Sequence, residues 1–176
     1  MALELGSIVL IHIVTLFFIS AAAKLVSFQA FIDFTIDFRI LPERLSKAAA
    51  VSIPFLELLG AGLLLVGPAR IYGTVILVSL LLLFGYAVTR VLKTNRQVSC
   101  GCYGKLIDAK ADSFTIGKIV YFLGLILFFT AINPPYTAAL SAPAVITGTA
   151  LTLLFLLTQL IWETHSAALE RLRRIK

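Results

Sequence analysis

Charged residues are scarce in this chain, and cysteine is scarcer still. Of its 176 residues only 14% are charged while 60% are hydrophobic, whereas about half of a soluble domain is apolar. The mean hydropathy is +1.01. This composition excludes an ordinary soluble domain. We see no shift in composition that would mark a linker, and no internal repeat, so we expect a single integral membrane domain over residues 1–176.

Apolar runs of membrane-spanning length are abundant. A span needs roughly 20 apolar residues, and five runs reach that length, at residues 5–26, 46–66, 70–93, 114–132 and 142–164. Apart from charged residues at the ends of these runs, the charged side chains within them are Glu57 in the second run and Lys118 near the start of the fourth. The pattern predicts an all-α fold, a polytopic membrane helical bundle of about five transmembrane helices, with a four-helix core plus one.

The first run has an alternative interpretation as a cleaved signal peptide, because Ala21-Ala22-Ala23 resembles a small-residue cleavage site. A signal peptide begins with positive charge. The residues before this run carry Glu4 and neither Lys nor Arg, and the run is long for the apolar part of a signal. We therefore expect it to be a retained helix.

Two shorter segments organise the first half of the chain. Residues 28–39 place Gln29 and two aspartates at every fourth position among apolar neighbours. This pattern is typical of a short amphipathic helix at the membrane interface, which Pro42 would end; an ordered loop that caps the bundle is the alternative. The turn at residues 67–70 should make the second and third runs an antiparallel hairpin.

The basic residues indicate an orientation. The formal net charge is +6, and in a membrane protein Lys and Arg concentrate in cytoplasmic loops. With the N-terminus outside, every Lys and Arg except Arg70 falls in or beside a cytoplasmic segment. We expect a bacterial-type plasma membrane protein with its N-terminus out, its C-terminus and the loop at 94–113 cytoplasmic, and no nucleic-acid partner.

The two cysteines stand together in that loop as a CxC motif, Cys100-Gly101-Cys102. A disulfide between residues this close needs a folded backbone, which Gly101 permits, and a strained ring is easily reduced. Basic residues on both sides favour the reactive thiolate. The motif predicts a redox-active pair in which Cys100 and Cys102 are the catalytic residues; two incidental thiols are the alternative.

A metal site is the competing chemistry. Two thiolates supply half of a tetrahedral zinc site, and soft thiolates also suit copper(I). His165, near the inner end of the last run, is the further ligand that this alternative would use.

Polar side chains inside the runs mark a second set of candidates. A carboxylate within a span is costly and suggests function. Glu57 and His12 lie at similar depths on adjacent runs, so we expect that they could meet. The functional interpretation is a proton or quinone site beneath the dithiol; the alternative is a protonated Glu57 that serves packing. Lys24 is expected to extend toward the inner interface, and it is also a candidate supporting residue of this proton or cavity site, together with Glu57 and His12.

Three of these groups resemble a known family. Lys24-Leu25 with Phe28, Pro54-x-x-Glu57-x-x-Gly60, and Cys100-Gly101-Cys102-Tyr103-Gly104 resemble, in order and spacing, the methylamine-utilisation MauE family, which is related to DoxX-like redox-associated membrane proteins. Two positions depart from the family pattern. Tyr103 stands where the family more often has Phe. Where the family often has an Arg-Asn pair at the start of the next span, this chain has only Lys118.

The resemblance implies a small helical bundle that works in thiol-disulfide exchange with a thioredoxin-like protein or a redox subunit, with Gly101 and Tyr103 supporting the cysteines. A single pair cannot serve both membrane faces by thiols alone. A moving loop, a quinone or a partner subunit would complete the relay, as a thiol-disulfide oxidoreductase. Soft-metal transport and a non-catalytic scaffold for a redox complex are the alternative functions.

Overall fold

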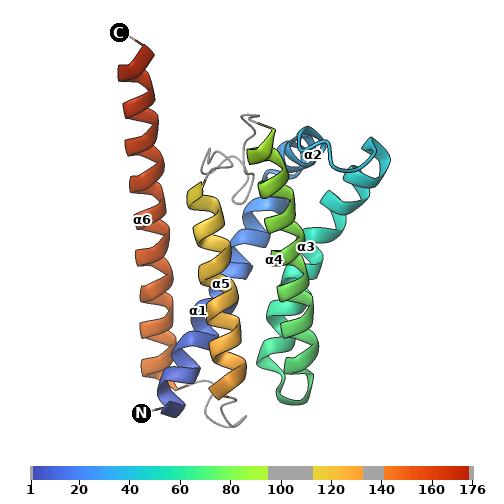
Figure 1. Ribbon diagram of the computed structural model, residues 1–176. Coiled ribbons are helices and arrows are strands. Elements are labelled where there is room, and N and C mark those ends of the chain that lie inside the picture. The colour runs from blue at the N-terminus through green and yellow to red at the C-terminus, as the bar shows by residue number, and fades with distance from the viewer. Residues whose placement is uncertain (1, 95–112, 133–140, 175–176) are drawn as a thin grey trace.

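Helices make up the whole of the described fold. The computed structural model describes residues 2–94, 113–132 and 141–174, and these contain no strand. In chain order the helices are α1 (Ala2–Val26), α2 (Phe28–Asp37), α3 (Glu43–Leu65), a 3-10 turn η1 (Gly67–Ala69), α4 (Arg70–Lys93), α5 (Ser113–Ile132) and α6 (Ala142–Arg174) (Figure 1). The predicted all-α bundle is confirmed.

Five of the helices are long and apolar enough to cross a membrane. They are α1 and α3 to α6, whose mean hydropathies lie between 1.9 and 2.3. Large apolar side chains such as Phe18, Leu83 and Ile146 remain exposed on their outer faces. Such a surface requires a lipid environment, and the chain is therefore an integral membrane protein.

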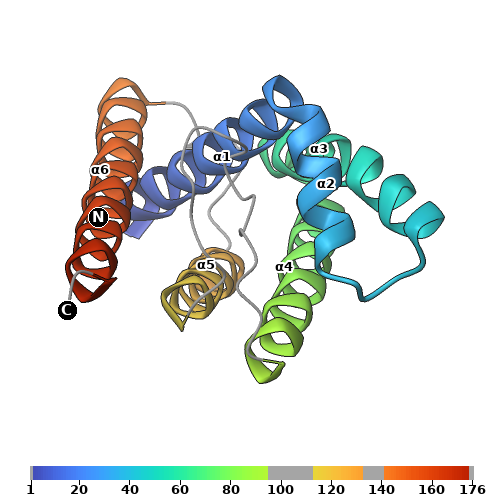
Figure 2. The ribbon, with the colours of Figure 1, turned by 90° about the horizontal axis from the view of Figure 1, so that it is seen from above.

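Helix α1 is the centre of the bundle. It packs against α3, α5 and α6, and 56% of its apolar window is buried, against 22–33% in the other spans. Seen from above, α1 crosses the bundle diagonally, with α6 on one side and α2 and α3 on the other (Figure 2). Because α1 has neighbours around most of its circumference, the polar side chains that it carries are held inside the protein.

A close antiparallel hairpin joins α3 to α4 through η1, as the turn at residues 67–70 predicts. At the contact, a Cβ atom added to Gly73 would lie 2.7 Å from the carbonyl oxygen of Gly60. Only glycine permits this approach of the two backbones. Arg70, at the start of α4, is buried and donates from Nε to the carbonyl oxygen of Leu64 at 3.2 Å.

Helix α2 confirms the amphipathic segment, with Ala30 and Phe31 buried against the bundle. Its end differs from the expectation. The helix stops at Asp37, and Arg39 then adopts a left-handed backbone with φ 49°. Pro42 does not end α2 but stands directly before the first residue of α3. Proline suits that place because the first turn of a helix needs no amide donor.

Helix α6 packs along α1 and continues past the predicted span. The expected span ends near residue 164, close to the end of the apolar span Ala142–Ser166, and the helix itself runs on to Arg174. Its 33 residues are about 50 Å long at 1.5 Å per residue, more than the ~30 Å hydrocarbon core. Its last turns project beyond the other helices (Figure 1). At its other end Gly148 meets α1, where an added Cβ would lie 2.9 Å from Ile11.

Candidate functional site

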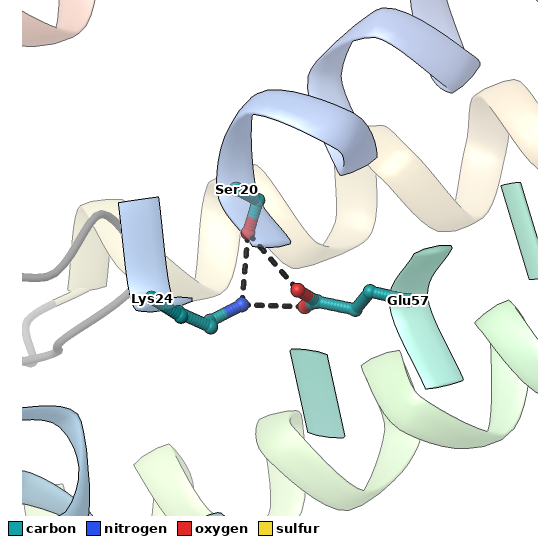
Figure 3. Close-up of polar contacts among 3 residues, drawn as sticks. All are labelled: Ser20, Lys24 and Glu57. Atoms are coloured by element: carbon teal, nitrogen blue, oxygen red, sulfur yellow. Dashed lines mark hydrogen bonds and ion pairs between the residues drawn. The ribbon is translucent and has the colours of Figure 1, made fainter. Parts of the chain in front are cut away.

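A buried ion pair joins α1 to α3. Lys24 Nζ lies 2.5 Å from Glu57 Oε1, and the two side chains are only 7% and 9% exposed. Figure 3 shows both side chains pointing toward each other, with Ser20 beside them. The expectation that Lys24 extends to the interface is therefore wrong, because Glu57 provides a buried partner that holds its ammonium inside the bundle.

Ser20 completes a three-membered polar cluster. Lys24 donates to Ser20 Oγ at 2.8 Å, and Ser20 Oγ donates to Glu57 Oε2 at 3.5 Å. Ser20 and Lys24 are four residues apart, so they share one face of α1. The ammonium also lies 5.5 Å from the centre of the Phe31 ring of α2. The cluster thus fixes three helices around one carboxylate, both of whose oxygens have a donor.

His12 belongs to a different network. Its Nδ1 lies 2.9 Å from Thr152 Oγ1 on α6, and its Nε2 lies 3.1 Å from the Tyr121 hydroxyl on α5. The expected contact between His12 and Glu57 is not found. Depth along two spans does not determine which faces they turn toward each other, and α1 turns His12 to the side that α5 and α6 cover.

A cavity of about 520 Å³ lies between α1, α2, α3, α4 and α5, and the ion pair forms part of its wall. Its lining is largely apolar. The side chain of Lys118, on α5, also lines it. Lys118 is 7% exposed, and its Nζ has no hydrogen-bond partner within the described residues. The sequence marks Lys118 as a charge within a span, but nothing in its spacing indicates a place on the cavity wall.

The CxC motif and its supporting residues lie outside the described residues: Cys100, Gly101, Cys102 and Tyr103. The segment that carries them leaves α4 after Thr94 and enters α5 at Ser113. Both points lie at the end of the bundle where α2 is found (Figure 1). Residues near both points, Ala87 of α4 and Thr115 of α5, line the cavity. Two helices that line the cavity, α4 and α5, therefore precede and follow the CxC motif in the chain.

The metal alternative would combine His165 with Cys100 and Cys102, and the two cysteines lie outside the described residues. His165 is exposed on α6. Within residues 2–94, 113–132 and 141–174, no group of three or more His, Cys, Asp or Glu side chains could hold a metal ion.

The fold and the site together define a small polytopic membrane helical bundle with a buried Lys-Glu pair facing an apolar cavity. Comparison with known proteins gives the family. The family model described as methylamine utilisation protein MauE matches residues 3–132, and the chain belongs to this family. The match confirms the resemblance seen in the sequence. It includes α1 to α5, whereas α6 lies outside it.

One curated relative is the methylamine utilization protein MauE of Paracoccus denitrificans, which is 33% identical over 94 residues. The match covers 53% of this chain and 50% of the relative, so the chain spans about half the length of the curated relative. No solved structure matches the chain.

Proposed function

We propose that this MauE-family protein is a membrane-embedded thiol-disulfide redox protein that exchanges disulfides with a thioredoxin-like or client protein through Cys100 and Cys102. One observation carries the proposal. The only two cysteines of the chain form a CxC motif between α4 and α5, two of the helices that line the cavity with the Lys24–Glu57 pair in its wall.

Chain length limits where the dithiol can be. Cys100 follows Thr94 by six residues, and an extended chain advances at most about 3.6 Å per residue, or ~22 Å in all. Thr94 ends α4, one of the helices around the cavity. This reach supports the proposal that a water-soluble partner meets the dithiol at this end of the bundle.

The proposed chemistry is a reversible exchange. The thiolate of one cysteine attacks a sulfur of the partner's disulfide, so that this bond breaks and a mixed disulfide forms. The second cysteine then attacks the mixed disulfide, closes the Cys100–Cys102 bond and releases the partner as a dithiol. The partner gains the two electrons and two protons that the protein's dithiol loses, and the same steps run in reverse.

The buried pair has a role in moving protons. Each cycle of the dithiol releases or takes up two protons. Glu57 lies between two donors, Lys24 and Ser20, in the cavity wall. We propose that the Lys24–Ser20–Glu57 cluster passes a proton to or from this cavity, since an ionisable group inside a membrane bundle typically serves such a relay.

The proposed partner is cytosolic. The basic residues of α1 to α4 support this orientation because all except Arg70 lie at the α2 end of the bundle, including Lys24, Arg44 and Lys93 (Figure 1). Positive charge accumulates on the cytoplasmic side. We therefore propose that the N-terminus lies outside and that the CxC segment and the C-terminus lie inside.

Trapping of the partner tests the exchange. Replacing the resolving cysteine should leave the mixed disulfide intact, so either Cys100→Ser or Cys102→Ser should yield a covalent adduct on non-reducing gels that reductant releases. The Cys100→Ser/Cys102→Ser double variant is the control and should give none. If neither single variant captures a partner and the double variant supports normal growth of the host, a non-catalytic scaffold explains the protein better.

A further inference from the structure

Lys118 is a buried cation in the cavity wall. Lys24 and Glu57 form an ion pair, whereas Lys118, on α5, has no hydrogen-bond acceptor within the described residues. Its Nζ has almost no accessible surface and lies 5.2 Å from the centre of the Phe114 ring, which is not among the residues that line the cavity. A buried ammonium without an acceptor is costly in a membrane interior. A turn of this flexible side chain into the cavity would bring its ammonium to an oxygen of a bound ligand.

The cavity has the size and character of a ligand site. Its volume of about 520 Å³ falls in the range of about 300–1,000 Å³ typical of small-molecule pockets, which are largely apolar with few polar groups. Aromatic rings from four helices contribute to its walls, including Phe17, Phe31, Phe84 and Phe122. Such rings pack well against a flat conjugated ring.

The cavity also has an apolar exit. Leu56 of α3 and Leu83 of α4 line it and are 37% and 67% exposed. Both lie within helices that span the membrane, so their exposed faces meet lipid. A hydrocarbon tail can leave the cavity here and continue into the bilayer without crossing a polar surface.

From these features we infer that the cavity binds a membrane quinone. The head ring lies among the aromatic side chains, and the isoprenoid tail leaves past Leu83. The flexible Lys118 side chain turns into the cavity and donates a hydrogen bond to one carbonyl oxygen. A neutral head suits a cavity with few polar groups better than a phosphate does, because a phosphate would bring several acceptors to one ammonium.

This inference rests on the proposed function and gives the relay its electron acceptor. When the Cys100–Cys102 bond forms, the dithiol loses two electrons and two protons. The quinone takes up both to become the quinol, so the dithiol is oxidised and the quinone reduced with no further reactant. Lys118 stabilises the negative charge that develops on the quinone oxygen during the transfer.

Binding is measured apart from the exchange by using the Cys100→Ser/Cys102→Ser protein, purified in detergent, with decylubiquinone as the probe. We expect saturable binding. Lys118→Met should weaken it roughly tenfold or more, as expected for loss of a hydrogen bond from a charged donor. Lys47→Met, the same change at an exposed position of α3, is the control and should bind normally. Ala87→Leu, which fills the cavity without altering Lys118, should also weaken binding.

A stability measurement separates a ligand role from a structural one. Without quinone, Lys118→Met should melt at a temperature equal to or above that of the parent, since it removes a buried unpaired charge. Added decylubiquinone should raise the melting temperature of the parent but not of Lys118→Met.

Three results would overturn the inference. The first is the absence of saturable binding by the folded parent. The second is binding by Lys118→Met and Ala87→Leu that is as strong as that of the parent. The third is a Lys118-dependent binding of oleate that is stronger than that of the quinone. The last result would assign the cavity to a fatty acid. Quinone binding without any mixed-disulfide partner would count against the exchange alone, and partner trapping without quinone binding would count against this inference alone.

Discussion

At the scale of single residues, the Lys24–Glu57 pair is the feature that the sequence half predicted. The position of Glu57 within a span marked it as unusual, and this holds. Its partner was not predicted, since Lys24 stands at the end of a span, where lysine commonly reaches toward the interface. The high cost of an isolated buried carboxylate was the signal that Glu57 needs a positively charged partner. The preceding span contains one cation, Lys24, which lies four residues from Ser20 on the same helical face.

We predict that the ion pair stabilises the bundle only when both partners are present. Glu57→Gln or Lys24→Met should each lower the free energy of unfolding by about 3–5 kcal/mol, because each leaves an uncompensated charge or an unsatisfied donor in the interior. The Lys24→Met/Glu57→Gln double variant should recover much of this loss. Thermal unfolding of the purified variants measures it.

The exposed pair Lys47–Glu43 is the matched control, as the two side chains are 54% and 66% exposed. Lys47→Met should change the stability by less than about 1 kcal/mol. Losses in the Lys24 and Glu57 variants that simply add in the double variant would contradict a coupled pair.

At the scale of elements, apolar length alone located the five spans to within a few residues at most ends. The packing order was not predictable in the same way. In a bilayer both the lipid-facing and the protein-facing sides of a helix are apolar, so periodicity does not distinguish a central helix such as α1 from a peripheral one such as α6. Apolar length also gave the span of α6 but not the polar turns that continue the helix to Arg174.

We predict that two glycine contacts hold these helices together. Gly73→Ala should separate α3 from α4, and Gly148→Ala should separate α6 from α1, because each added methyl would lie within 3 Å of atoms of the facing helix. We expect a loss of about 1–3 kcal/mol for each, as for overpacking.

Gly62→Ala is the control for both, since nothing lies within 4 Å of an added Cβ there. It should be neutral or stabilising, as alanine is the better helix former. Melting curves of the three variants in one detergent provide the comparison, and equal melting temperatures for all three would show that the helices do not depend on these close approaches.

At the scale of the whole molecule, the interfacial helix α2 and the two helix ends that flank the CxC motif lie at one end of the bundle (Figure 1). The cavity, with the Lys24–Glu57 pair in its wall, is lined by residues of α1 to α5. The sequence predicted the dithiol and the charge bias of this end from residue spacing. It did not predict the cavity, whose walls combine side chains from five helices.

The charge bias predicts a cytoplasmic C-terminus. A fluorescent protein fused after Lys176 should be fluorescent in intact cells, and alkaline phosphatase at the same place should be inactive, because only the periplasm oxidises the phosphatase. As a control, the phosphatase inserted at the turn between α3 and α4 should be active. The reverse pattern would place the CxC segment outside and make its partner extracytoplasmic.

The most direct test of the account is the redox state of the native cysteines in membranes. Samples of cells are taken before treatment, after brief exposure to oxidant, and after a following exposure to reductant. Each sample is quenched with acid and then treated with a thiol-reactive mass tag. The account predicts that Cys100 and Cys102 change together, from two tagged thiols to none and back, while Cys100→Ser and Cys102→Ser each keep one tagged thiol or form an adduct. A native pair that stays in one state through the whole cycle would contradict it.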